Sequence, residues 1–315
     1  MWAKKKNSLS EVRKNIEILG VKLPKVIHVA GTNWKGSVCA YLSNILIENH
    51  LQVGTLISPH LIEVNERILL DMTPISDREL ECISKYVREK LSGKSTAPTY
   101  FEYIFYIATV FFSKSNPDYV ILETGMGGRL DVTNVFEDTL SIITSIGMDH
   151  MQFLGNSIKE IAYEKAGIIK DNSTVIFDDS NEEANEIIIE NAKAKEAKII
   201  PLSDFDYESL KFTYVKYKKK AAALAILGAG QLLNTIDNID EAVTKTVWHG
   251  RMEEIEKDII IDGAHNEPAI IEFTDNAMKL AKVNNKKIKL LISVVKDKEV
   301  ERIFDIITSK LEVKK

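Results

Sequence analysis

One stretch near the N-terminus restricts the fold of this chain more than any other. Residues 26–30 are mostly apolar and indicate a buried strand, residues 31–36 form a turn with two glycines, and residues 37–48 have helical periodicity. This order points backbone N–H groups and a helix N-terminus at one place, which suits phosphate. Lys35 adds a mobile positive charge, and Ser37 adds a hydroxyl that can reach Mg²⁺. The stretch predicts a phosphate-binding loop, and a strand–helix turn without a ligand is the alternative.

Strands and helices alternate through the rest of the N-terminal two thirds of the chain. Strands separated by helices predict a mostly parallel sheet with right-handed crossovers, that is, an α/β fold. Residues 202–220 are mixed and charged, and we expect a surface excursion there. The further strands are expected at residues 54–58, 118–123, 140–146 and 174–177, and the further helices at residues 8–19, 76–91, 99–113, 157–163 and 181–195.

A second, smaller α/β unit is expected after residue 246. The periodic pattern restarts there and predicts strands at 259–262 and 288–295 and helices at 268–281 and 299–309. We therefore expect two domains, residues 1–246 and 247–315.

Composition excludes several classes of protein. A formal net charge of −5 and a pI near 5.8 argue against a nucleic-acid binder. The longest apolar stretch, residues 103–112, is too short to cross a bilayer, and no apolar segment follows the basic N-terminus as in a signal peptide. Cys39 and Cys82 have no spacing typical of a metal site or a disulfide framework. We expect a soluble, cytoplasmic protein that acts as a monomer.

Acidic and histidine side chains stand where three expected strands end. They are Glu123, the pair Asp149 and His150, and the pair Asp262 and His265. Ligands of open α/β sheets bind beyond the carboxyl ends of the strands, and carboxylate oxygens suit Mg²⁺. A turn-capping carboxylate or a structural histidine is the alternative at each position.

Ten motifs in order give the chain a strong resemblance to a known family. Together they resemble the folylpolyglutamate synthase/dihydrofolate synthase family of Mur-type ligases, nearly from end to end. The motifs are Gly31–Ser37, Ser58–Leu61, Glu66–Ile68, Phe101–Glu102, Leu122–Asn134, Thr144–His150, Glu164–Lys170, Trp248–Glu253, Asp262–Asn266 and Lys296–Lys298.

The resemblance implies a fold and an activity. The fold would be a P-loop-type, mostly parallel sheet ATPase domain followed by a smaller, truncated α/β Mur-ligase C-terminal domain. The activity would be ATP-dependent addition of L-glutamate to a folate or a pteroate through an acyl phosphate, with Mg²⁺ as cofactor and ATP as co-substrate. No nucleic acid and no membrane would take part.

The resemblance also implies a role for each matching residue. Lys35, Lys165 and His150 would be catalytic, and Lys165 matches the lysine that is carbamylated in the family. Ser58, Pro59 and His60 would contact the folate substrate, and Ser58, Glu123 and His150 would hold the metal. The expected ATP contacts are Asn33, Lys35, Gly36, Ser37, Asn234, Arg251, Asp262 and His265, with Asn234 in a Gln-x-x-Asn motif that begins at Gln231.

Three departures from the family favour an alternative function. Trp34 replaces a glycine, where we expect an unusual φ and an indole that occupies the phosphate site. The segment from Asn234 to Trp248 is short, with its helix largely deleted, and the chain ends at Lys315 before the closing strands of the family. The alternative is a degenerate relative that binds nucleotide or folate with weak or no turnover. The sequence does not separate dihydrofolate synthase from folylpolyglutamate synthase or from an enzyme with both activities.

Overall fold

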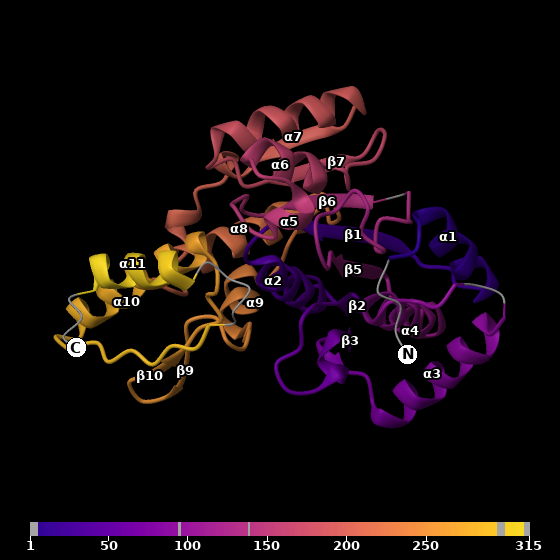
Figure 1. The fold of residues 1–315 in the computed structure, drawn as a ribbon, viewed down its shortest axis with the longest axis horizontal. Helices are drawn as coiled ribbons and strands as arrows, with labels where there is room; N and C mark the ends of the chain where they lie inside the picture. Colours follow the sequence, from indigo (N-terminus) through magenta and orange to yellow (C-terminus); the bar gives the residue numbers. More distant parts are fainter. Residues whose placement is uncertain (1–5, 94–95, 138, 295–299, 312–315) are drawn as a thin grey trace.

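An eight-stranded sheet forms the centre of the molecule (Figure 1). The computed structural model describes residues 6–93, 96–137, 139–294 and 300–311. The strands follow one another across the sheet in the order β4 (Thr73–Pro74), β3 (Ile68–Leu70), β2 (Val53–Leu56), β5 (Tyr119–Glu123), β1 (Lys25–Ala30), β6 (Thr139–Ile143), β7 (Thr174–Phe177) and β8 (Lys198–Pro201). Strands β3 and β4 are the antiparallel strands at one edge. The other six strands are parallel, as the alternating sequence pattern predicts.

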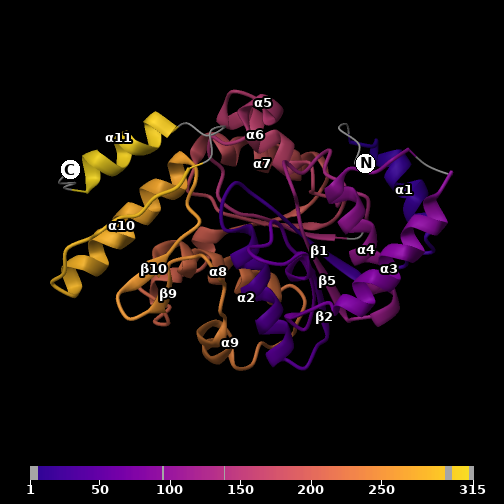
Figure 2. The ribbon, with the colours of Figure 1, turned by 60° about the horizontal axis from the view of Figure 1, so that its bottom comes forward.

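The central strand β1 (Lys25–Ala30) is buried on both faces of the sheet. Successive side chains of a strand point to opposite faces. Ile27 and Val29 therefore pack with helices α2 (Lys35–Glu48) and α8 (Lys216–Ala229). Val26 packs on the other face with helices α1 (Leu9–Ile18), α3 (Asp77–Leu91) and α4 (Tyr100–Ser115). Helices α6 (Ile158–Ala166) and α7 (Glu182–Ala194) extend that second layer over β6 and β7. Figure 2 shows the helices on both faces of the sheet.

The elements follow the expected order closely. The strands of the large sheet are β1, β2 (Val53–Leu56), β3 (Ile68–Leu70), β4 (Thr73–Pro74), β5 (Tyr119–Glu123), β6 (Thr139–Ile143), β7 (Thr174–Phe177) and β8 (Lys198–Pro201). The helices up to residue 245 are α1 (Leu9–Ile18), α2 (Lys35–Glu48), α3 (Asp77–Leu91), α4 (Tyr100–Ser115), α5 (Met151–Leu154), α6 (Ile158–Ala166), α7 (Glu182–Ala194), α8 (Lys216–Ala229) and α9 (Ile239–Lys245).

The expected surface excursion over residues 202–220 is wrong at its end. Helix α8 begins at Lys216 and packs against α2, with Tyr217 and the residues 221–225 buried. The lysine run made the segment look exposed, but Lys220 is buried and pairs with Asp178 at 3.2 Å. The helix expected to be largely deleted after Asn234 survives as the seven-residue α9.

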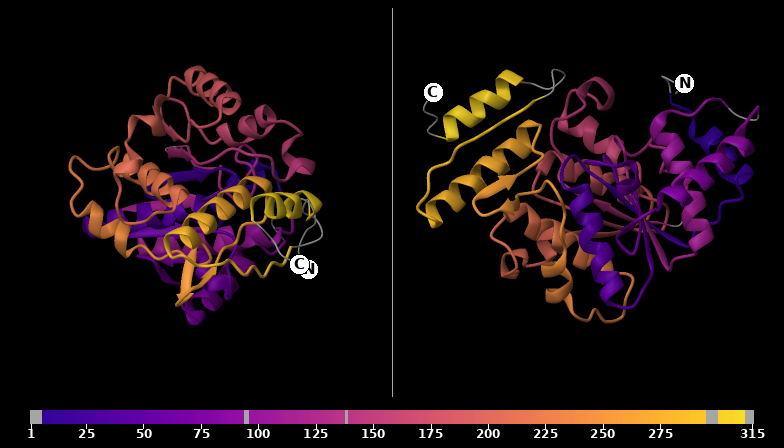
Figure 3. Two further views of the ribbon diagram at one scale, coloured as in Figure 1. Left: turned by 90° about the vertical axis from the view of Figure 1, so that its left-hand side faces the viewer. Right: turned by 90° about the horizontal axis from the view of Figure 1, so that it is seen from below.

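The C-terminal region, residues 247–294 and 300–311, is simpler than expected. Strand β10 (Ile259–Ile261) pairs antiparallel with β9 (Glu253–Glu256), and α10 (Glu267–Val283) packs against α11 (Val300–Lys310). Figure 3 shows these elements together beside the large sheet.

The strand expected at residues 288–295 is wrong within the described residues 288–294. These residues run without strand pairing, and Leu291 is 98% exposed. An apolar alternation predicts a strand only where a neighbouring strand supplies hydrogen bonds. Residue 295 and the Lys296–Lys298 motif lie outside the described residues.

None of the helices in the described residues is both long enough and apolar enough to cross a bilayer.

Candidate active site at the carboxyl edge of the sheet

The loop Gly31–Gly36 leaves β1 and enters α2 in a conformation fixed by the exit of β6. Thr32 N donates to Ser145 O at 2.7 Å, and Thr144 Oγ1 donates to Asn33 O at 2.6 Å. Gly31 has φ +149°, and a Cβ there would lie 1.7 Å from Thr144 Oγ1. Trp34, at the N-cap of α2, makes no capping hydrogen bond through its side chain within the described structure, which leaves backbone N–H groups at this N-terminus for an anion.

Two lysine side chains converge on one carbonyl of this loop. Lys35 Nζ donates to Gly31 O at 3.1 Å, and Lys165 Nζ, from α6, donates to the same oxygen at 2.7 Å. Burial, and then the charge of Lys35, lower the pKa of Lys165 from 10.5 to about 7. Lys165 therefore has a large uncharged fraction near neutral pH, which is the form that reacts as a nucleophile.

Glu123 lies opposite Lys35, at the end of β5. Its side chain accepts a hydrogen bond from Ser58 N at 2.9 Å, and Lys35 Nζ lies 4.0 Å from its other oxygen. Burial raises the pKa of Glu123, while the positive charge of Lys35 opposes that rise. A buried carboxylate beside a phosphate loop is suited to a hard cation.

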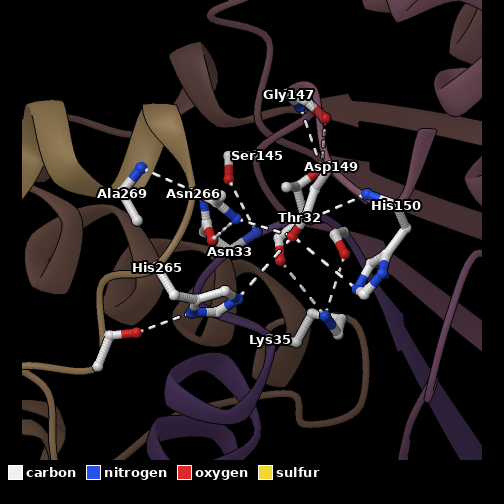
Figure 4. Close-up of polar contacts among 12 residues, drawn as sticks. Thr32, Asn33, Lys35, Ser145, Gly147, Asp149, His150, His265, Asn266 and Ala269 are labelled. Carbon is white, nitrogen blue, oxygen red and sulfur yellow. Dashed lines mark hydrogen bonds and ion pairs between the residues drawn. The ribbon is translucent and has the colours of Figure 1, made fainter. Parts of the chain in front are cut away.

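Asp149 joins the sheet to the C-terminal region (Figure 4). Asn266 Nδ2 donates to Asp149 Oδ2 at 2.9 Å, and His150 Nε2 and His265 Nε2 each lie 3.9 Å from the same oxygen. Asn266 and Asn33 also exchange amide hydrogen bonds, at 3.1 and 3.0 Å. The start of α10 is thus attached directly to the phosphate loop.

These side chains surround a cavity of about 370 Å³. It lies between the sheet and the C-terminal region and contains most of the residues expected at the site. Those on its wall are Asn33, Lys35, Gly36, Ser58, Pro59, Glu123, His150, Lys165, Arg251 and His265.

Four expected residues lie away from the cavity wall. Asn234 is exposed after α8, and the Nδ1 atom of His60 accepts a hydrogen bond from Arg67 Nε at 2.8 Å. The carboxylate of Asp262 accepts from Tyr217 OH at 3.0 Å and from two backbone N–H groups, so it supports the local fold here. Ser37 is buried in the first turn of α2.

The donor atoms suit Mg²⁺ and a nucleotide phosphate. The buried Ser37 Oγ has no hydrogen-bond partner among the described residues, and such an atom needs a ligand to offset its desolvation. Glu123 and Ser58 add the oxygen ligands that Mg²⁺ prefers. No cluster of three or more His, Cys, Asp or Glu side chains suited to a metal is found in the described part of the chain, so the phosphate oxygens would have to complete the shell.

Trp34 has the expected backbone but not the expected side-chain position. Its φ is 64°, in the left-handed region that favours glycine. The indole does not fill the phosphate loop: it is 6% exposed, stacks on Tyr217 and donates from Nε1 to Glu272 Oε2 at 2.8 Å. The prediction that it occupies the phosphate site is therefore wrong.

Sequence reasoning missed several residues of the site. Asn266 was noted only within a motif, Asp149 was expected only as a strand-end carboxylate and not as a contact to α10, and Glu272 and Asp131 received no role. Asn266 did carry a signal, because asparagine before Glu-Pro is a common helix start, and Asn266 caps α10. Glu272 has no local signal, since its partners lie far away in sequence.

Asp131 anchors the glycine-rich turn after Glu123. It accepts from Met126 N at 3.0 Å and from Thr133 Oγ1 at 2.7 Å. Thr133 in turn lies 2.7 Å from Nε2 of the buried His28 on β1. Because the threonine proton goes to the carboxylate, His28 must carry its proton on Nε2. This chain of contacts fixes the turn against the strand that precedes the phosphate loop.

The fold and this cavity define a phosphate-loop α/β protein whose ligands bind between a parallel sheet and a C-terminal region. The model of the Mur ligase middle domain matches residues 29–239. The chain is 36% identical to the dihydrofolate synthase/folylpolyglutamate synthase of Bacillus subtilis, in an alignment that covers 87% of this chain and 72% of the relative. The corresponding protein of Haemophilus influenzae is 29% identical, in an alignment that covers 95% of this chain and 75% of that protein.

Solved structures give the same result. E. coli FolC in complex with DHPP and ADP superimposes with a TM-score of 0.88 at 28% identity, over 98% of this chain and 79% of that one. A bifunctional folylpolyglutamate synthase/dihydrofolate synthase with Mn, AMPPNP and L-glutamate bound gives a TM-score of 0.84 at 27% identity, with the same coverage of 98% and 79%. The chain belongs to the dihydrofolate synthase/folylpolyglutamate synthase family of Mur-type ligases.

Proposed function

We propose that this chain is an ATP-dependent ligase that adds L-glutamate to a folate, to dihydropteroate, or to both. One observation carries the proposal beyond family membership. The loop lysine Lys35 faces the buried Glu123 in a cavity that Arg251 and His265 close from the C-terminal region. A phosphate loop, a metal-binding carboxylate and a second region that covers them are what acyl-phosphate chemistry needs.

Lys35, Gly36, Ser37 and the N-terminus of α2 would hold the ATP phosphates. Ser58, Glu123 and His150 would hold Mg²⁺, which would neutralise charge on the phosphate oxygens when bound. Arg251 and His265 would approach the nucleotide from the opposite wall. Asn234 and Asp262 stay predictions, because they lie away from the cavity wall.

In the first step, a carboxylate oxygen of the folate or pteroate attacks the γ-phosphorus of ATP, the bond to the β-phosphate oxygen breaks, and ADP leaves. Lys35 balances the charge that develops on the transferred group. In the second step, the amine of glutamate attacks the acyl carbon, and the C–O bond to phosphate breaks. The departing phosphate takes up the proton that the amine loses, and an amide remains. The cavity between the two regions keeps water from the acyl phosphate.

Lys165 would act as its family counterpart does. An uncharged amine attacks CO₂ to give a carbamate, and the lowered pKa of Lys165 makes this form abundant near neutral pH. The resulting carboxylate-like group would lie beside the phosphate loop. Loss of the carbamate would return an amine that is only partly charged near neutral pH.

We further propose that residues 1–246 and 247–315 are separate domains. We also propose that the protein acts as a monomer in the cytoplasm.

The second candidate is a relative that binds ligands without turnover. The left-handed φ of 64° at Trp34 favours it, since a side chain other than glycine there costs on the order of 1 kcal/mol. The position of the indole argues against it. The indole is held by Tyr217 and Glu272, and a cavity of about 370 Å³ remains although Trp34 is part of its wall.

The test is a product assay. The protein is incubated with ATP, Mg²⁺, L-glutamate and either dihydropteroate or tetrahydrofolate, and both phosphate release and the mass of the pterin product are measured. We expect one glutamyl residue per phosphate released, and no product from Lys35→Ala. Tight nucleotide binding without product in either reaction would support the second candidate.

A further inference from the structure

The indole of Trp34 lies in a slot between the N-terminal part of the chain and α10. Tyr217 of α8 forms one wall, stacked with the indole at 6.4 Å between ring centroids and an interplanar angle of 17°. Lys220 Nζ lies 5.6 Å from the ring centroid and provides a cation–π contact. Glu272 of α10 accepts the indole N–H at 2.8 Å. A residue of the phosphate loop therefore reaches across to the C-terminal region.

The two side chains that flank the indole make further hydrogen bonds. Lys220 Nζ is held by Asp178 Oδ1 at 3.2 Å and by Ser180 Oγ at 3.1 Å. Tyr217 OH donates to Asp262 at 3.0 Å. The indole is thus seated on side chains that are themselves fixed.

A second contact of the same kind stands next to it. Asn33 exchanges two amide hydrogen bonds with Asn266, the N-cap of α10. Asn33 and Trp34 are consecutive in the loop, and Asn266 and Glu272 lie on the same helix. Two contacts at different points of one helix restrain its tilt as well as its distance from the loop.

The environment of Glu272 supports a directional contact. Burial raises the pKa of the Glu272 carboxyl to about 7. The hydrogen bond from the indole and the charge of Lys220 lower this pKa, whereas the charges of Asp178 and Asp262 raise it. A largely buried carboxyl needs a donor, and Trp34 Nε1 supplies one.

We infer that Trp34 is a positioning residue, whose hydrogen bond to Glu272 joins α10 to the phosphate loop and so fixes Arg251 and His265 over it. The catalytic part of this inference rests on the proposed ligase function, and the structural part does not. The stacked indole also holds residue 34 in its left-handed conformation. Loss of the bond should lower kcat more than it raises KM for ATP, because the loop amides and Lys35 still bind phosphate.

The structural test is hydrogen exchange of the backbone amides in α10, measured by mass spectrometry on the full chain. Trp34→Phe keeps a stacking ring and loses the donor, and Glu272→Ala loses the acceptor. We expect each variant to exchange about tenfold faster in residues 266–283, the ratio that one buried hydrogen bond supports. The double variant should exchange no faster than either single one, because both remove the same bond.

Two control variants distinguish the loss of this hydrogen bond from a general loss of stability. Glu272→Gln keeps an acceptor oxygen and should retain wild-type exchange, and Lys279→Ala changes an exposed residue of the same helix and should have no effect. Wild-type exchange in Trp34→Phe, or additive effects in the double variant, would overturn the inference. If the amides of α10 exchanged as fast in Glu272→Gln as in Glu272→Ala, that result would also overturn the inference.

Kinetics give the second readout. We expect a lower kcat for Trp34→Phe and Glu272→Ala and its recovery in Glu272→Gln. A Trp34→Gly variant that binds ATP more tightly and turns over faster would mean that the indole obstructs the site, and would overturn the inference. If no variant and no wild-type protein forms product, the proposed function fails, and the exchange experiment still decides whether the contact joins the two parts.

Discussion

Replacing Lys165 by methionine tests both the electrostatics and the chemistry of the site. The lysine is buried, and its Nζ donates to Gly31 O at 2.7 Å. Methionine is an unbranched chain that fills much of the same space without charge. The variant therefore removes one ionisable group and one hydrogen bond with little change in packing.

The pKa of Lys165 gives the expected magnitude. It falls from 10.5 to about 7 on folding, so the folded chain releases this proton first as the pH rises, and wild-type stability increases between pH 7 and 10.5. Between pH 6 and 9 the wild-type free energy of unfolding should therefore rise by about 3 kcal/mol. The rise comes from the roughly two pH units between the folded pKa and pH 9, at about 1.4 kcal/mol per unit. The methionine side chain does not titrate, so the free energy of unfolding of Lys165→Met lacks this rise. At pH 6 the variant should be the more stable protein, because a buried charge costs more than the roughly 1 kcal/mol that the hydrogen bond contributes.

The assay is urea unfolding followed by circular dichroism at pH 6, 7, 8 and 9, together with phosphate release at pH 7.5. Lys159→Met, at an exposed lysine on the same helix, is the matched control and should keep a constant difference from wild type. We expect Lys165→Met to lose about a hundredfold or more in turnover, as expected for a group that acts on transition-state charge. Parallel stability curves for wild type and Lys165→Met would refute the assignment of a lowered pKa.

Three further variants follow from the geometry. Gly31→Ala should lower the melting temperature sharply and abolish turnover, because its Cβ would lie 1.7 Å from Thr144 Oγ1, and a melting temperature equal to that of wild type would contradict this. Ser37→Ala should retain wild-type stability, since its buried hydroxyl has no partner in the described structure, but should raise the KM for ATP in the phosphate-release assay. Glu272→Gln should remove one contribution to the pH dependence of stability. The pKa of Glu272 rises from 4.5 to about 7 on folding, so this carboxyl lowers the wild-type free energy of unfolding by about 3 kcal/mol between pH 4.5 and 7. In urea unfolding, the difference between wild type and variant should change by that amount, and a constant difference would contradict the raised pKa.

The central part of the fold could be predicted because its signals are local. Strand β1 and its loop are contiguous in sequence, and the exits of β5 and β6 are marked by Glu123 and Asp149. The rule that ligands lie beyond the carboxyl ends of parallel strands then brings Lys35 and Glu123 together without any knowledge of the contacts.

The errors arose where a residue's surroundings come from distant segments. Lys220 looked like part of an exposed basic run, and its burial depends on Asp178, which the sequence places in another element. Residues 288–294 have the pattern of a strand but no neighbouring strand with which to pair.

Trp34 illustrates the same limit at the site. The prediction of its unusual φ needed only the family pattern, and it is confirmed. The destination of its indole depends on Tyr217 and Glu272, which lie far along the chain and on different helices. A side chain that was expected to block the loop instead connects the loop to α10.

The most direct test of the proposed ligase follows one oxygen atom. The folate or pteroate substrate is prepared with ¹⁸O in the reacting carboxylate and turned over with ATP, Mg²⁺ and L-glutamate, and the released phosphate is examined by mass spectrometry. An acyl-phosphate mechanism transfers one labelled oxygen to each phosphate, because the carboxylate oxygen that attacks phosphorus leaves with it. We predict labelled phosphate in equal amount to the glutamylated product. Unlabelled phosphate, or no product at all, would contradict the proposed mechanism.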